Sequence, residues 1–233
     1  KERQDHEKQH PVKVSSFWMK KHEVTQREYK DVMGRNPSKF GGRDAPVEQV
    51  TWYEAVEYCN KLSEKQGFKP YYGINKDTKD ADNTSEYDKL KYTVTIIGGT
   101  GFRLPTEAEW EYACRGGATT PFHYGNKLDS AMANFDGHYP YNAGDGLVRN
   151  KTLPVGSFKP NAYDLYDMHG NVAEWCWDWF GDYNNAMNNP IGAASGSQRV
   201  VRGGYWGIHA DALRSAARDL SGANAKNPGI GFR

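Results

Sequence analysis

Cysteine, net charge and long apolar runs are all scarce in this sequence of 233 residues. The three cysteines are Cys59, Cys114 and Cys176, and an odd number excludes complete internal pairing. No two of them have CxxC spacing and no histidine accompanies them at ligand spacing, which argues against a zinc site. Their small apolar and aromatic neighbours favour buried free thiols. One disulfide with one free thiol is the alternative.

The charge of the chain is almost balanced, with 30 basic and 29 acidic residues and a formal net charge of +1. This balance gives no electrostatic reason to expect nucleic acid or an anionic membrane as a partner. No run of about 18 apolar residues is present, so we expect no transmembrane segment. Hydrophobic residues make up 37% of the chain and aromatic residues 13%. The core must therefore depend on large aromatic side chains.

Three helix starts share one local device. Thr25, Thr51 and Thr106 are each followed three residues later by Glu, which is the pattern of the capping box and predicts a helix after each threonine. Residues 92–97 alternate and predict a strand. From about 116 to 165 the chain is rich in Gly, Asn, Asp and Pro and has few periodic runs. These patterns indicate the α+β class with much irregular structure.

The chain reads as one domain. Residues 1–11 are polar and are predicted to form a disordered tail, and residues 12–233 are predicted to form a single domain without a repeat or linker. An irregular stretch as long as 116–165 is uncommon in compact domains. It needs support other than strand hydrogen bonds, and a bound cation is one candidate.

Five blocks along the chain carry a family resemblance. They lie at residues 45–64, 101–117 (GFRLPTEAEWEYACRGG), 161–179 (NAYDLYDMHGNVAEWCWDW), 199–206 (RVVRGGYW) and 229–233 (GIGFR). In this order they resemble the formylglycine-generating-enzyme, or sulfatase-modifying-factor, family from about residue 12 to the end. The resemblance implies an elaborated C-type lectin fold.

The enzymes of this family carry two cysteines after the RGG turn and bind copper(I) with them, because thiolate and copper(I) are both soft. In this sequence no cysteine follows Cys176, and Ile208 stands at the position of the first. The stretch to Arg218 is about three residues shorter, so the second has no counterpart. Iron-dependent relatives use clustered histidines, whereas the seven histidines here are scattered. We therefore predict no enzyme activity and no catalytic cofactor. A family enzyme of either kind, or an accessory domain of unknown chemistry, is the alternative.

The C-terminal segment 199–233 also resembles the variable proteins of diversity-generating retroelements, in which adenine-directed mutagenesis changes selected positions between fixed framework residues. The matching framework residues are Arg202, Gly203, Gly204, Trp206, Ala210, Leu213, Arg214, Arg218, Gly231, Phe232 and Arg233. The intervening positions hold Tyr205, Gly207, Ile208, His209, Asp211, Ala212, Asp219, Leu220, Ser221, Gly222 and Ala223. Each residue type in the second set can arise from changes in the first two bases of an asparagine codon.

The resemblance predicts a non-enzymatic display protein, in which these eleven positions form a ligand-binding surface on a rigid scaffold. Tyr205 and His209 would supply amphipathic contacts, and Ile208 and Leu220 would supply apolar anchors. We expect a protein or glycan as the ligand, no nucleic acid as a partner, and a monomer. The resemblance also implies export to the cell surface with a lipid anchor.

Members of the family often carry two calcium sites, and both sets of ligand positions are present. The first set is the side chains of Asn134 and Asp145 with the carbonyls of Phe135 and Leu147. The second set is the side chains of Asp167 and Glu174 with the carbonyls of Gly170 and Val172. Hard oxygen ligands of this kind suit calcium, so the resemblance implies a structural Ca²⁺. The alternative is that Asp167 and Glu174 are solvated or paired with arginine.

Overall fold

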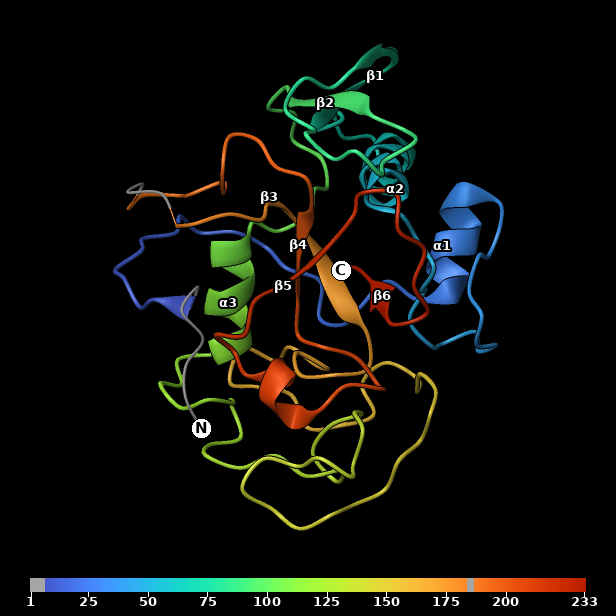
Figure 1. The fold of residues 1–233 in the computed structure, drawn as a ribbon. Helices are drawn as coiled ribbons and strands as arrows, with labels where there is room; N and C mark the ends of the chain where they lie inside the picture. Colours follow the sequence, from blue (N-terminus) through green and yellow to red (C-terminus); the bar gives the residue numbers. More distant parts are fainter. Residues whose placement is uncertain (1–6, 184–186) are drawn as a thin grey trace.

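The computed structural model describes residues 7–183 and 187–233 (Figure 1). Its helices are α1 (Gln26–Met33), α2 (Trp52–Lys65), α3 (Glu107–Arg115) and the 3-10 helix η2 (Ala210–Leu213). Its strands are β1 (Tyr72–Lys79), β2 (Tyr92–Ile96), β3 (Ala173–Trp179), β4 (Arg199–Arg202), β5 (Asp219–Ser221) and β6 (Ile230–Gly231). The architecture is α+β, as the sequence predicts, and no named helix or strand lies within residues 116–172.

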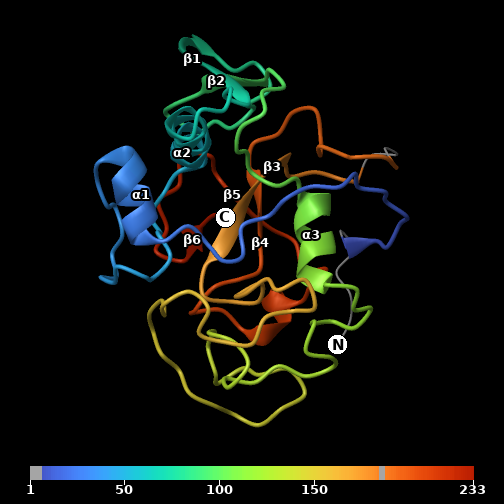
Figure 2. The same cartoon turned by 180° about the vertical axis from the view of Figure 1, so that it is seen from behind.

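The central sheet has the strand order β5-β4-β3-β6. Strand β4 runs antiparallel to both β3 and β5, while β6 runs parallel to β3. Three of these four strands therefore come from the C-terminal segment 199–233. Both views place α3 on one side of the central strands and α1 and α2 on the other (Figures 1 and 2). The β1–β2 hairpin forms a separate sheet at the end of the molecule beyond α2.

The three predicted capping boxes are confirmed. In each, the threonine hydroxyl accepts a hydrogen bond from the backbone N–H of the glutamate three residues on, at 3.1–3.2 Å. Each glutamate accepts in return from the threonine N–H at 2.8–2.9 Å. The sequence therefore determines where α1, α2 and α3 begin through contacts that lie within four residues.

The core is aromatic, as the composition predicts. Trp52, Trp110 and Trp175 are fully buried, and the indole N–H groups of Trp52 and Trp175 donate to the carbonyls of Cys176 and Val50 at 2.9 Å. Donation of both N–H groups removes the cost of burying them. All three cysteines are buried free thiols. None of the described helices is both long and apolar enough to cross a bilayer.

The irregular region 116–172 is held by its own buried cluster. Phe122, Leu128 and Phe135 are fully buried there, and they pack with Ala210 and Leu213 of η2. This apolar packing stabilises the region, which has no strand hydrogen bonds of its own within a named sheet. It also fixes the position of η2, because the helix contributes its two apolar side chains to the cluster.

Part of the predicted disordered tail is ordered. Residues 1–6 lie outside the described residues, but Glu7 is only 4% exposed and pairs with Arg214 at 2.7 Å. Further on, the N–H of Lys13 donates to the carbonyl of Met187 at 2.8 Å. The prediction of disorder through residue 11 is therefore corrected at Glu7. The local composition predicted disorder, but it could not predict an ion pair with a residue 207 positions away.

Asp178 of β3 links the sheet to the first turn of α3. Its Oδ2 accepts from the N–H of Glu107 at 2.8 Å, and its side chain is almost fully buried. This hydrogen bond satisfies one of the four N–H groups that a helix start leaves without a partner. Burial, together with the negative charge of Glu107, raises the pKa of Asp178 to about 8.

This raised pKa predicts a pH-dependent stability. Between about pH 4 and 8 the unfolded chain releases a proton that the folded chain keeps, so the contribution of Asp178 to stability falls as the pH rises through this window. Asp178→Asn does not titrate and keeps the acceptor. We expect its free energy of unfolding, relative to the parent, to rise by up to about 1.4 kcal/mol per pH unit. Urea unfolding of both proteins at pH 5, 6 and 7 measures this difference, and a constant difference would contradict the assignment.

Candidate ligand-binding surface

A buried arginine connects the C-terminal segment to α3. The side chain of Arg202 is fully buried at the end of β4. Its guanidinium donates to the carbonyls of Ser215, at 2.8 Å, and Ala217, and it pairs with Glu111 at 2.6 Å. Charge-assisted hydrogen bonds of this kind are strong and directional. Arg202 therefore holds the backbone of the segment against α3.

Two further framework arginines form bidentate ion pairs in the interior. Arg218 pairs with Glu107 of α3 at 2.7 and 2.8 Å. Arg233 pairs with Glu174 of β3 at 2.7 and 2.6 Å. The planar guanidinium matches a carboxylate with two parallel hydrogen bonds, which fixes orientation as well as distance. The middle and the C-terminal end of the segment are thereby tied to the scaffold.

The turn after β4 requires its two glycines. Gly203 and Gly204 have φ values of 92° and 69°, which residues other than glycine rarely adopt. A Cβ on Gly204 would lie 2.5 Å from Leu213 Cδ1, and a Cβ on Gly203 would lie 3.0 Å from Trp110. The turn thus brings the segment into close contact with η2 and α3.

Leu213 anchors the middle of the segment. Its side chain is fully buried, and its carbonyl accepts from Nδ1 of His169 at 2.7 Å. The other nitrogen of His169, Nε2, accepts from the N–H of His123 at 3.2 Å. Burial lowers the pKa of His169 to about 3, so the ring is neutral and keeps the tautomer that this arrangement requires.

The eleven predicted binding positions differ in burial from the framework between them. Gly207, His209 and Asp219 are exposed. The half-buried positions are Tyr205, Ile208, Asp211, Ala212, Leu220, Ser221 and Gly222. Most of the framework is buried: Arg202, Gly203, Gly204, Ala210, Leu213, Arg218, Gly231, Phe232 and Arg233. Buried and accessible residues therefore alternate within one segment, which crosses the near side of the molecule in Figure 1.

Ala223 departs from this pattern. Its side chain is fully buried in the main core, and its carbonyl accepts from the N–H of Trp52 at 3.1 Å. The prediction that position 223 contributes to the binding surface is therefore corrected. The motif spacing could not show this, because the chain turns inward after β5 toward the start of α2.

We expect Ala223→Leu to lower the free energy of unfolding by about 1–3 kcal/mol, since overpacking a filled core displaces its neighbours. The matched change Ala212→Leu, at a half-buried position of the same segment, should cost less than about 0.5 kcal/mol. Thermal unfolding of both variants measures the contrast. Equal losses would place position 212 in the core as well.

The structure adds fixed aromatic side chains to the rim of this surface. The Tyr139 ring lies 5.2 Å from that of His209, and 58% of Tyr139 is exposed. Phe40 packs edge-on against Trp206 at 5.3 Å. Tyr139 and Phe40 were missed by sequence reasoning, since both lie in irregular chain without periodicity. Trp177 packs against the main core, Trp179 is buried, and the guanidinium of Arg199 lies over both rings.

In the second calcium set, Glu174 is paired with a guanidinium, while Oδ1 of Asp167 has no hydrogen-bond partner among the described residues, and calcium at this set stays a prediction. Both carboxylate oxygens of Glu174 accept from Arg233, and one also accepts from the indole N–H of Trp110 at 2.7 Å. The guanidinium thus supplies the positive charge, as the alternative reading of Glu174 proposed. Burial raises the pKa of Asp167, whose Oδ2 accepts from the N–H of Gly156 at 2.5 Å.

The first calcium set is more open. Asn134 is fully buried, and its Oδ1 has no hydrogen-bond partner among the described residues. Phe135 is buried, whereas Asp145 and Leu147 lie in exposed chain. Within residues 7–183 and 187–233, no group of three or more His, Cys, Asp or Glu side chains is placed to hold a metal. Oδ1 of Asn134 could serve as one of the metal ligands, and calcium at this set stays a prediction.

Curated relatives match over very different shares of their own length. The chaperone protein LppX of Paenibacillus barcinonensis is 42% identical over 237 residues, which cover 95% of this chain and 80% of LppX. The formylglycine-generating enzyme of Bos taurus is 33% identical over 201 residues, which cover 82% of this chain and 43% of the enzyme. The chain thus spans most of LppX and less than half of the bovine enzyme.

Solved structures share the fold. Treponema denticola variable protein 1 superposes with a TM-score of 0.78 and 34% identity, over 95% of this chain and 84% of that chain. PvdO from Pseudomonas aeruginosa gives a TM-score of 0.65 and 26% identity, over 91% and 77%. The predicted C-type lectin-like fold of the formylglycine-generating-enzyme type is confirmed, as is the resemblance to a variable protein of a diversity-generating retroelement.

The family profile described as the sulfatase-modifying factor enzyme 1-like domain matches residues 1–233, the whole of the chain. Together with the LppX relative, this match shows that the chain belongs to the FGE-sulfatase family.

Proposed function

We propose that this protein is a non-enzymatic binding protein whose C-terminal segment displays a diversified surface for a protein or glycan ligand. The observation that carries the proposal is the separation of roles within residues 199–233. Framework side chains such as Arg202 and Leu213 are buried and tied to the scaffold, while positions such as His209 and Asp219 are open to solvent. Side chains of the second kind can change without removing the contacts that hold the segment.

The residues at the positions of the family's copper-binding cysteines support the same proposal. Ile208, at the position of the first family cysteine, is half-buried and packs against the cluster around Phe122. Its carbonyl accepts from the N–H of Asp136 at 3.0 Å. No cysteine follows Cys176 in the sequence. An aliphatic side chain offers no ligand for a soft metal, so these residues suit contact with a partner rather than thiolate chemistry.

The similarity to Treponema denticola variable protein 1 supports a display scaffold, and we propose export to the cell surface with a lipid anchor. Fractionation of the source cells tests this part, with recovery in the membrane fraction as the expected result. A template repeat and a reverse transcriptase encoded beside the gene would support diversification. Their absence would count against it.

A matched pair of libraries tests the binding surface. The first randomises Tyr205, His209 and Asp219, and the second randomises Lys61, Glu64 and Lys65, which are exposed on α2. Both are displayed and selected against one unrelated globular protein. We expect specific binders from the first library at micromolar Kd or better, and at least tenfold fewer from the second. Equal yields, or none from the first, would overturn the proposal.

A further inference from the structure

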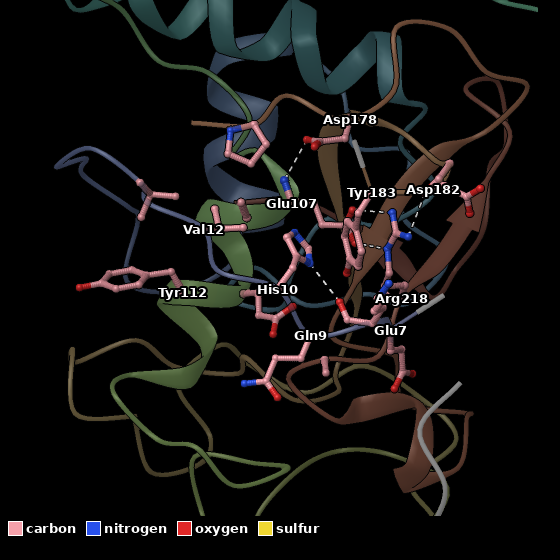
Figure 3. Close-up of a pocket in the computed structure, with 18 of the residues that line it drawn as sticks. Glu7, Gln9, His10, Val12, Glu107, Tyr112, Asp178, Asp182, Tyr183 and Arg218 are labelled. Carbon is pink, nitrogen blue, oxygen red and sulfur yellow. Dashed lines mark hydrogen bonds and ion pairs between the residues drawn. The ribbon is translucent and has the colours of Figure 1, made fainter. Parts of the chain in front are cut away.

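A cavity of about 470 Å³ lies between α3, the N-terminal residues 7–14 and the residues within 178–183 and 190–193 (Figure 3). None of the eleven candidate display positions lines it. Small-molecule sites occupy cavities of about 300–1,000 Å³ with apolar walls and a few convergent polar groups. The volume therefore suits a small ligand.

Aromatic and small apolar side chains form the walls. Tyr112 contributes from α3, Trp179 from the end of β3, and Val12 from the N-terminal residues. The ring centres of His10 and Tyr183 lie 4.2 Å apart with their planes tilted by 48°, and the guanidinium carbon of Arg218 lies 4.2 Å from the Tyr183 ring centre. Tyr183 is therefore held in the wall by its contacts with His10 and Arg218.

The acidic groups of the cavity differ in how they are neutralised. Glu107 pairs with Arg218, and Glu111 pairs with Arg115 at 2.7 Å. Asp178 forms no ion pair with the described residues, although it is almost fully buried. In Figure 3 its carboxylate lies at the end of the cavity beside Glu107, away from Gln9. The cavity therefore contains one buried carboxyl group that forms no ion pair with the described residues, and Arg199 is the nearby positive charge that acts on it.

We propose that this cavity binds a small organic ammonium ion with an aromatic or apolar body. The ammonium group would pair with Asp178, and the body would pack on Tyr112, Trp179 and Tyr183. Aromatic faces attract cations, most strongly where water is excluded. Arg218 is held by Glu107 and Arg115 by Glu111, and Glu111 also pairs with Arg202.

The electrostatics of Asp178 agree with this assignment. Its pKa is raised to about 8, first by burial and then by the charge of Glu107. A bound cation favours the ionised form of a neighbouring carboxyl group. The ligand would thus replace the proton that Asp178 holds in the empty cavity.

Isothermal titration calorimetry with three probes of similar size tests the proposal. Phenethylamine, 2-phenylethanol and phenylacetate share an aromatic body and differ in charge. We expect phenethylamine to bind saturably and at least tenfold more tightly than the alcohol, with phenylacetate the weakest. No saturable binding of phenethylamine, or equal affinity for amine and alcohol, would overturn the proposal.

Two substitutions locate the site. Asp178→Asn keeps the acceptor for Glu107 and should reduce the preference for amine over alcohol at least tenfold, while its unfolding transition reports that it is folded. The control Asp77→Asn, on exposed chain of β1, should leave the preference unchanged. An unchanged preference in Asp178→Asn would overturn the assignment. This outcome is independent of the display surface, since no display position lines the cavity.

Discussion

We expect Arg202→Met to lower the free energy of unfolding by about 2–5 kcal/mol, because each buried carbonyl that loses its donor costs about 1–3 kcal/mol. The substitution removes the donors to the carbonyls of Ser215 and Ala217 and one of the two cations of Glu111, which keeps its pair with Arg115. Met retains much of the aliphatic volume of Arg202. The loss of unfolding free energy therefore measures the contribution of the guanidinium charge and its hydrogen bonds. Urea unfolding gives the difference.

The control is Arg115→Met on α3, one helical turn after Glu111. Arg115 also pairs with Glu111, but both side chains are more than a quarter exposed. Exposed ion pairs contribute about 0–1 kcal/mol, so the control should change stability little. Similar losses in the two variants would show that burial of Arg202 does not support the segment.

The second large effect concerns two residues four positions apart. We expect Leu213→Ala to cost about 2–5 kcal/mol, because it opens a cavity in the cluster that joins η2 to residues 122–141. His209→Ala, at an exposed position, should cost less than about 0.5 kcal/mol. Thermal and urea unfolding of both variants measure the contrast. A loss at His209 as large as that at Leu213 would contradict the division between frame and surface.

Local patterns in the sequence predicted the helices well. Each capping box at Thr25, Thr51 and Thr106 depends on four consecutive residues, and each formed as expected. The family resemblance predicted the fold, which periodicity alone did not indicate. Arg202 and Arg218 match framework positions of the variable-protein pattern, and both are buried in ion pairs.

Features that depend on distant partners were not predictable in the same way. Ala223 became core because the chain after β5 meets α2. Glu7 became ordered through Arg214, and Glu174 took Arg233 as its cation. Tyr139 joined the surface because its carbonyl accepts from the N–H of Ala210. In every case the deciding contact joins residues far apart in the sequence.

Simultaneous randomisation of the ten partly or fully exposed display positions, followed by urea unfolding of about twenty individual clones, tests the central claim most directly. The account predicts that most clones unfold cooperatively within about 3 kcal/mol of the parent, because their frame contacts through Arg202, Leu213 and Arg233 are unchanged. Aggregation, or loss of the cooperative transition in most clones, would contradict it.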